Sequence, residues 1–219
     1  MFVLALDTST PTLVCGVVEV SGGSVTTRAE RRLAQCRQHN EVLVPTTQEV
    51  LAEAGLEFSG LDAVVVGEGP GPFTGLRVGM ATGAAFGDAL GIPVFGVCSL
   101  DAIATQINLP SALVATDARR REVYFAAYSN GQRLGEPQVM APAQVTGTFD
   151  QVSVPEHLSE KLAAQGPRVD LTPTAASLVQ VADLKATPRP LQPLYLRRPD
   201  AKEPKATPAS PAIPDVRLD

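Results

Sequence analysis

Residues 61–97 read LDAVVVGEGPGPFTGLRVGMATGAAFGDALGIPVFGV, and the order of segments within them indicates the fold class. The first segment, residues 61–67, is a nearly continuous apolar run, as in a strand that is covered on both faces. A glycine- and proline-rich loop follows, and residues 74–90 then have the length and composition of a long helix. Gly-Ile-Pro at 91–93 stops that helix, and residues 94–97 form another strand. The stretch therefore predicts strand, helix and strand, as in an α/β protein.

The segments that precede and follow this stretch extend the same pattern. Three short apolar or β-branched runs at 2–7, 13–20 and 25–30 predict three consecutive strands in a meander. Residues 40–55 have helical periodicity, and residues 100–107 predict a further helix. The order βββαβα indicates a twisted mixed sheet with helices packed against it.

The second half of the chain carries weaker signals. We expect strands at 112–116 and 122–128 and helices at 156–164 and 175–184. The domain organisation that we predict is a first lobe at 1–108, a smaller second lobe at 109–198 and a proline-rich, flexible tail at 199–219.

The composition limits the class of protein. The chain has 219 residues, a formal net charge of −5 and 44% hydrophobic residues. Such a chain can bury a core, and its acidic balance disfavours a protein whose main task is to bind nucleic acid. No apolar run approaches the roughly 18–20 residues that a membrane span needs. The three cysteines, Cys15, Cys36 and Cys98, are widely spaced, which favours a reducing, cytoplasmic location without disulfides.

Glycines recur at every fourth position of the predicted long helix, at Gly75, Gly79, Gly83 and Gly87. Each of them costs about 0.5–1 kcal/mol relative to alanine inside a helix. The close approach of another backbone, which side chains would prevent, is a physical reason to accept this cost. That backbone belongs either to this chain's own sheet or to a helix of another subunit, and the spacing alone leaves both possibilities open.

Two segments look like phosphate-binding sites without matching one fully. Residues 67–75 form a glycine-rich loop before a helix, but they lack the lysine of a phosphate loop, and two prolines remove backbone donors. Asp7, Thr8 and Ser9 follow the first strand, where a carboxylate and hydroxyls can hold a magnesium-bound phosphate. A local turn in which these side chains satisfy their own backbone explains the same residues.

The remaining ionisable residues show no obvious catalytic cluster. His39 and His157 lie in different halves of the chain, and neither has a partner at metal-ligand spacing, so we expect surface or capping roles for them. Arg119, Arg120 and Arg121 form a compact basic patch. This patch predicts either a solvated turn or a contact with the phosphates of a bound partner or RNA.

Several segments occur in a characteristic order: LALDTST at 4–10, GEGPGPFTGLRVGMATG at 67–83 with GVCSLDAIA at 96–104, DARRREVYFAAY at 117–128, and PLYLRRPDA at 193–201. Taken together, they resemble the TsaB (YeaZ) family of tRNA-modification proteins. The run GPGPFTGLRVG is the most specific of these, and the ordered set covers most of the chain.

This resemblance implies an α/β protein with an ASKHA (actin/Hsp70-like) fold, built from two RNase H-like lobes with mixed sheets flanked by helices. In such folds an acidic residue at the end of the first strand binds metal and phosphate, which makes Asp7, with Thr8 and Ser9, the remnant of a phosphate site. The related catalytic subunit TsaD has metal-binding histidines in the segment that corresponds to 96–104, whereas this chain has none there. The resemblance therefore implies no catalytic residue, no metal and no cofactor in this chain.

The resemblance also implies a function by assembly. TsaB-like proteins pair with TsaD and the ATPase TsaE, and the complex transfers a threonylcarbamoyl group to an adenosine of tRNA. We expect this chain to be the non-catalytic subunit that binds and activates TsaD, to meet tRNA only within the complex, to form a homodimer in isolation and not to bind membranes. The expected partner interface consists of Leu43, Thr47, Val50, Leu51, Gly75, Val78, Gly79, Gly83 and Gly87.

Two enzymatic functions are the alternatives. A metallopeptidase would agree with the description of relatives as glycoproteases, but it needs metal ligands that the sequence does not cluster. An ASKHA nucleotide phosphotransferase would use Asp7, but the second phosphate loop is missing.

Overall fold

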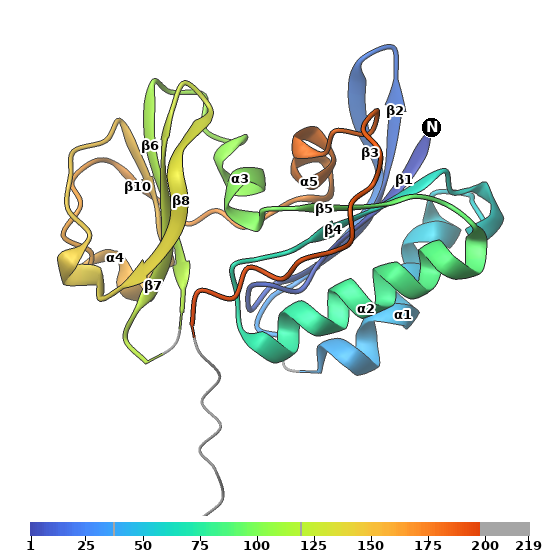
Figure 1. Ribbon diagram of the computed structural model, residues 1–219, viewed down its shortest axis with the longest axis horizontal. Coiled ribbons are helices and arrows are strands. Elements are labelled where there is room, and N and C mark those ends of the chain that lie inside the picture. The colour runs from blue at the N-terminus through green and yellow to red at the C-terminus, as the bar shows by residue number, and fades with distance from the viewer. Residues whose placement is uncertain (37, 119, 198–219) are drawn as a thin grey trace, which may run out of the picture.

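The computed structural model describes residues 1–36, 38–118 and 120–197. It contains two five-stranded sheets that lie next to each other, with helix α3 (Ser99–Ala104) between them (Figure 1). Arg119 and the proline-rich tail at 199–219 lie outside the described residues, so the expectations for them stay predictions.

The first sheet has the strand order β3-β2-β1-β4-β5. Its strands are β1 (Phe2–Asp7), β2 (Leu13–Ser21), β3 (Ser24–Leu33), β4 (Ala63–Gly67) and β5 (Val94–Val97). Strands β1 to β3 form an antiparallel meander, whereas β4 and β5 extend the sheet in parallel with β1. The helical segments of this part of the chain are α1 (His39–Glu53), the short η1 (Phe58–Gly60), α2 (Phe73–Leu90) and α3. The predicted order βββαβα is confirmed.

The second sheet repeats the plan of the first. Its strand order, β8-β7-β6-β9-β10, again combines an antiparallel meander with two parallel strands. The strands are β6 (Ser111–Asp117), β7 (Val123–Ser129), β8 (Gln132–Met140), β9 (Gln151–Ser153) and β10 (Arg168–Val169), and the helical segments are η2 (Pro142–Gln144), α4 (Glu156–Ser159) and α5 (Ala175–Val181). The duplication confirms the two RNase H-like lobes that the family resemblance implies. The helix predicted at 156–164 is reduced to the four residues of α4.

Both faces of the first sheet are buried, by helices from different parts of the chain. On one face α1 and α2 lie side by side and contribute Leu43 and Met80 to a core with Leu4 (Figure 1). On the other face α5 contributes Ala175 and Leu178. A strand such as β4, AVVVG, is buried throughout for this reason.

The last helix of each lobe packs on the sheet of the other lobe. Leu100 and Ile103 of α3 share a core with Ala112 and Val114 of β6, whereas α5 packs on β1 and β2. We expected residues up to 198 in the second lobe, and the structure shows that α5 and the segment after it pack on the first lobe. This packing was not visible in the sequence because the apolar face of a helix does not identify the sheet that it will cover.

The cysteines of the chain are free thiols. Burial raises the pKa of the Cys15 thiol to about 12 and that of Cys98 to about 11, so both stay protonated at neutral pH. In the part of the chain that the structure describes, no helix combines the length and apolar character needed to cross a membrane.

The first two glycines of the ladder bring α2 against the loop that follows β1. A Cβ atom added at Gly75 would lie 2.5 Å from the carbonyl oxygen of Thr8, and one added at Gly79 would lie 2.5 Å from the Thr8 hydroxyl oxygen. Real Cβ atoms essentially never come so close to another atom. Any side chain at these two positions would therefore push α2 away from the loop.

The last two glycines of the ladder pack on the sheet itself. A Cβ atom at Gly83 would lie 2.4 Å from a methyl group of Val66, and one at Gly87 would lie 2.2 Å from a methyl group of Val94. This corrects the explanation of the glycine spacing by another subunit: the backbone that approaches α2 at these positions belongs to the same chain. The cost of the glycines is offset inside the first lobe.

The residues of α1 that we expected at a partner interface also lie in the core. The exposed fractions of Leu43, Thr47, Val50 and Leu51 are between 0% and 3%. They are the apolar positions of the helix. Helical periodicity identifies such positions, but it does not show whether the chain's own sheet or another subunit covers them. A partner that docks on α1 must therefore contact its other face.

The packing of Gly83 makes a testable prediction. Gly83→Ala should lower the free energy of unfolding of the monomer by about 1–3 kcal/mol, because the added methyl group overlaps Val66. Ala52→Met, which adds a larger group at an exposed position of α1, should change it by less than about 0.5 kcal/mol. Urea unfolding measures both values. A Gly83→Ala variant that is about 1 kcal/mol more stable, as helix propensity alone requires, would contradict this packing.

Candidate functional site

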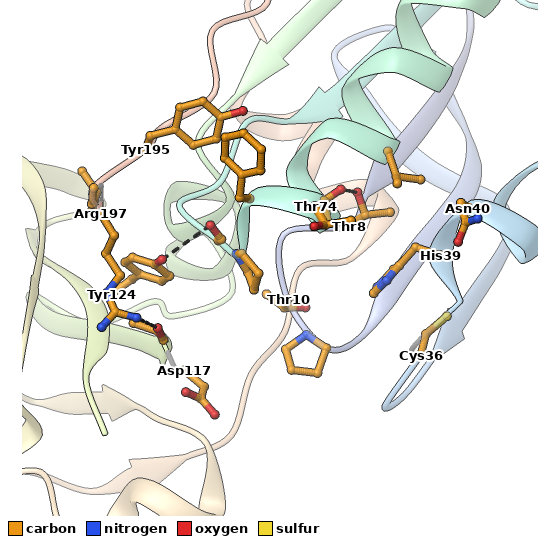
Figure 2. A pocket seen from close by; sticks show the side chains of 18 of the residues that line it. Thr8, Thr10, Cys36, His39, Asn40, Thr74, Asp117, Tyr124, Tyr195 and Arg197 are labelled. Atoms are coloured by element: carbon orange, nitrogen blue, oxygen red, sulfur yellow. Dashed lines mark hydrogen bonds between the residues drawn. The ribbon is translucent and has the colours of Figure 1, made fainter. Parts of the chain in front are cut away.

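A cavity of about 930 Å³ opens between the two lobes. Its first-lobe wall consists of the loop after β1, the start of α1 and the N-terminal turn of α2, and its second-lobe wall includes Asp117 of β6 and Tyr124 of β7 (Figure 2). Tyr195 and Arg197, near the end of the described chain, line another side (Figure 2). Because segments far apart in the sequence line the cavity, its shape depends on how both lobes fold.

Residues 189–197, which we call the C-terminal strap, are anchored on a buried carboxylate of the first lobe. Glu68, only 1% exposed, forms an ion pair with Arg189 and accepts the backbone N–H of Gln192 at 2.6 Å. Gly96 leaves the space for this carboxylate, since a Cβ atom there would lie 2.1 Å from its Oε1 atom. The strap therefore occupies a place that the first lobe is built to receive.

The strap then continues past α2 to the second lobe. Tyr195 stacks on Phe73 with 4.9 Å between ring centroids, and Arg77 lies 3.8 Å from the Phe73 centroid while its Nε donates to the Tyr195 hydroxyl at 3.0 Å. Arg197 donates to the carbonyl of Ala118 at 2.6 Å. The strap thus joins the two lobes along one side of the cavity.

Asp7 is fully buried and its carboxylate is held by its own chain. Ser9 donates to it from its backbone N–H and its hydroxyl, both at 2.7 Å, and Ser99 donates from its hydroxyl at 2.5 Å. Burial raises the pKa of Asp7, and these hydrogen bonds oppose the rise. A Cβ atom at Gly67 would lie 2.0 Å from Asp7 Oδ2, so glycine is required there as well. The carboxylate ties the end of β1 to the start of α3.

Thr8 connects the same loop to α2. Its hydroxyl donates to the carbonyl of Gly75 at 2.6 Å and accepts the N–H of Gly79 at 3.0 Å. The structure therefore does bring together Asp7, Thr8 and Ser9, the predicted remnant of a phosphate site. Of these three residues only Thr8 lines the cavity, and its hydroxyl is engaged by α2.

His39, at the start of α1, lines the cavity, whereas we expected a surface or capping role for it (Figure 2). Burial lowers the pKa of His39, although a hydrogen bond with the backbone of Thr10 and the charge of Asp7 oppose the change. Its Nε2 atom is buried and has no hydrogen-bond partner in the structure. Only its position before a predicted helix could have drawn attention to it.

The two enzymatic alternatives depend on His39, His157 and Asp7. His39 and His157 lie in different lobes, and among the residues that the structure describes no three His, Cys, Asp or Glu side chains gather as a metal site would require. The carboxylate that a phosphotransferase would use belongs to Asp7, which is engaged by the chain's own donors.

The burial of Asp7 predicts a pH-dependent stability. Because its pKa is raised above 3.8, the folded chain binds this proton more tightly than the unfolded chain does, so ionisation of Asp7 lowers the free energy of unfolding as the pH rises. Asp7→Asn removes this titration. The variant should therefore gain stability relative to the wild type as the pH rises from about 3 towards 7, as measured by urea unfolding over that range. A difference between the two proteins that is independent of pH would contradict the prediction.

Comparison with known proteins identifies relatives over most of the chain. A family model described as "TsaD: tRNA N6-adenosine threonylcarbamoyltransferase" matches residues 29–187. The TsaB protein of Escherichia coli (strain K12), described as a tRNA threonylcarbamoyladenosine biosynthesis protein, is 35% identical over 165 residues, which are 70% of this chain and 68% of that protein. An uncharacterized protein of Mycobacterium tuberculosis is 49% identical over 202 residues, which are 91% of this chain and 93% of that protein.

Other relatives differ more in length. An uncharacterized protein of Mycobacterium leprae is 51% identical over 203 residues, which are 91% of this chain but only 56% of that protein's length. The solved structure of YeaZ from Pseudomonas aeruginosa superposes with a TM-score of 0.67 at 29% identity, over 82% of this chain and 89% of that one.

The similar structure agrees with the two duplicated lobes described above, and the similar sequences extend over both of them. The chain therefore belongs to the TsaB (YeaZ) family, whose named members are tRNA threonylcarbamoyladenosine biosynthesis proteins.

Proposed function

We propose that this chain is a non-catalytic subunit of a tRNA threonylcarbamoyladenosine-modification complex in the cytoplasm, and that it binds and activates a TsaD-type transferase. The outward face of α1 and α2 is the observation that carries the proposal. The names of the relatives support the pathway, and the buried, self-satisfied carboxylate of Asp7 supports a role other than catalysis.

The outward face of α2 is smooth and has few charges. Ala81, Ala85 and Ala89 are exposed and follow one another at intervals of four residues, which places them in one row along the helix. Val44 of the neighbouring α1 is 41% exposed. We call these four residues the outer α1–α2 face. Small side chains in such a row allow a helix of another subunit to approach closely.

The glycine ladder supports this face indirectly. The glycines take the inward positions of α2 and hold the helix close to the sheet, while the alanines take the outward positions. Of the interface residues expected from the sequence, Gly75 and Val78 are partly exposed and remain candidates for direct contact. The buried ones would act by fixing the position of the two helices.

The proposal has further components. A TsaE-type ATPase joins the complex, and this chain contacts tRNA within that complex. Without the TsaD-type subunit, a second copy of this chain would occupy the outer α1–α2 face and form a homodimer. Binding of the TsaD-type subunit then requires that the homodimer dissociates.

A charge placed on the outer α1–α2 face should prevent assembly. Ala85→Glu should weaken co-purification with a TsaD-type subunit at least about tenfold, because a buried, unpaired carboxylate opposes docking. Ala186→Glu, on an exposed turn after α5, is the matched control and should bind as the wild type does. Size-exclusion chromatography of each mixture measures association. Equal binding by both variants would locate the interface elsewhere.

Reconstitution should show activation rather than catalysis. The purified chain alone should transfer no threonylcarbamoyl group to tRNA, and adding it to TsaD-, TsaE- and TsaC-type proteins should restore transfer, measured with radiolabelled threonine. Full transfer by the mixture without this chain would refute the activating role, and transfer by the chain alone would refute the non-catalytic one.

A further inference from the structure

A second hollow, of about 710 Å³, lies on the second lobe between the β6–β7 turn and α4. Its charged lining consists of Arg120 and Arg121 from the turn, His157 and Lys161 from α4 and the residues after it, and Asp117 from the end of β6. We call it the basic hollow. It shares Asp117 with the cavity between the lobes, and its other lining residues are different.

The charge of the basic hollow is opposite to that of the whole chain. Two arginines and a lysine, all exposed, line the hollow together with one carboxylate, that of Asp117, which contacts His157 Nε2 at 3.1 Å. The chain as a whole has a formal net charge of −5. Cations gathered in a concave surface create a local field that attracts anions even on an acidic protein.

The duplication of the lobes shows why this hollow is open. The β6–β7 turn corresponds in topology to the loop after β1, and α4 corresponds to α2. In the first lobe the 18-residue α2 packs on that loop through Thr8 and Gly75. In the second lobe the helix has only four residues, and the equivalent place remains accessible.

The backbone of the turn indicates that its arginines are present for their side chains. Arg120 and Arg121 have φ angles of 52° and 64°, in the left-handed region that favours glycine and asparagine. Two consecutive arginines in this region strain the backbone of the folded turn. Asparagine or glycine would adopt the same backbone angles with less strain. A residue that only had to reverse the chain direction would not need a guanidinium group.

We propose that the basic hollow binds the phosphodiester backbone of RNA. This rests on the proposed function, since it names the surface of this subunit that would contact tRNA in the complex. Guanidinium and ammonium groups bind phosphate oxygens directly, and such contacts position an RNA without reading its bases. The apolar lining is limited to small residues at 141–143 and to Leu158, which is 5% exposed, so the hollow offers little to the side chains of an acidic peptide.

Neutral residues suited to the turn provide the test. Arg120→Asn/Arg121→Asn removes two cations and keeps a backbone that asparagine adopts readily, so the melting temperature should be unchanged or higher. Arg28→Gln/Arg32→Gln, on β3 at the far edge of the first lobe, removes the same charge and is the control. Fluorescence anisotropy with a labelled, unmodified tRNA transcript should be measured on the full chain alone and with its TsaD-type partner. Co-purification with that partner should be scored on the same samples.

The turn variant should raise the Kd for tRNA about tenfold at about 0.1 M salt, and it should lower the slope of log Kd against log salt by about 1.4–1.8, as expected for two lost phosphate contacts. The control should leave both values unchanged. The proposal would be overturned if both variants lost tRNA affinity equally, if neither lost it, or if polyglutamate at the same charge concentration displaced tRNA.

The same samples separate this surface from the surface that docks the partner. If the turn variant loses tRNA binding and still associates with the partner, the two surfaces are distinct. Failure to associate while the turn still binds tRNA would instead refute the proposed function alone.

Discussion

The contact between α2 and the loop after β1 is the constraint on which the site depends. The Thr8 hydroxyl bonds to two backbone groups of α2, and this is possible only because Gly75 and Gly79 present no side chain. A methyl group at either position would separate the two segments and move the N-terminal turn of α2. That turn lines the cavity between the lobes, and it also carries Phe73, on which the strap stacks. One close approach therefore sets the outer α1–α2 face, the cavity wall and the path of the strap.

The strap adds a second, long-range constraint. Glu68 is a buried carboxylate, and a buried charge is tolerated only when its partners are in place. Its partners Arg189 and Gln192 follow it by 121 and 124 residues in the sequence. The strap also reaches the second lobe, where Arg197 bonds to Ala118. The relative position of the lobes is thus held by a segment that lies far in the sequence from both Glu68 and Ala118.

Local features were predictable from the sequence, and features that combine distant segments were not. Residues 61–97 predicted β4, α2 and β5, because apolar runs, glycines and prolines determine the secondary structure of the few residues around them. The role of Asp7 was not predictable in the same way, because one of its donors, Ser99, lies 92 residues away. The glycine ladder was predictable in one respect and not in another. Its spacing predicted a close approach to a backbone, but only the fold shows that this backbone belongs to the same chain.

The two lobes share one topology, and they differ at the place where the first and second strands of each lobe turn. In the first lobe a long helix covers that turn, and the hydroxyls of Thr8 and Ser9 form hydrogen bonds within the lobe. In the second lobe a four-residue helix leaves the turn accessible, and arginines replace the small hydroxyl residues. The long helix gives the first lobe a smooth outer surface, on which we propose protein contacts, and the short helix leaves the second lobe an open, basic one. A single difference in helix length therefore accounts for two surfaces of opposite character on a duplicated fold.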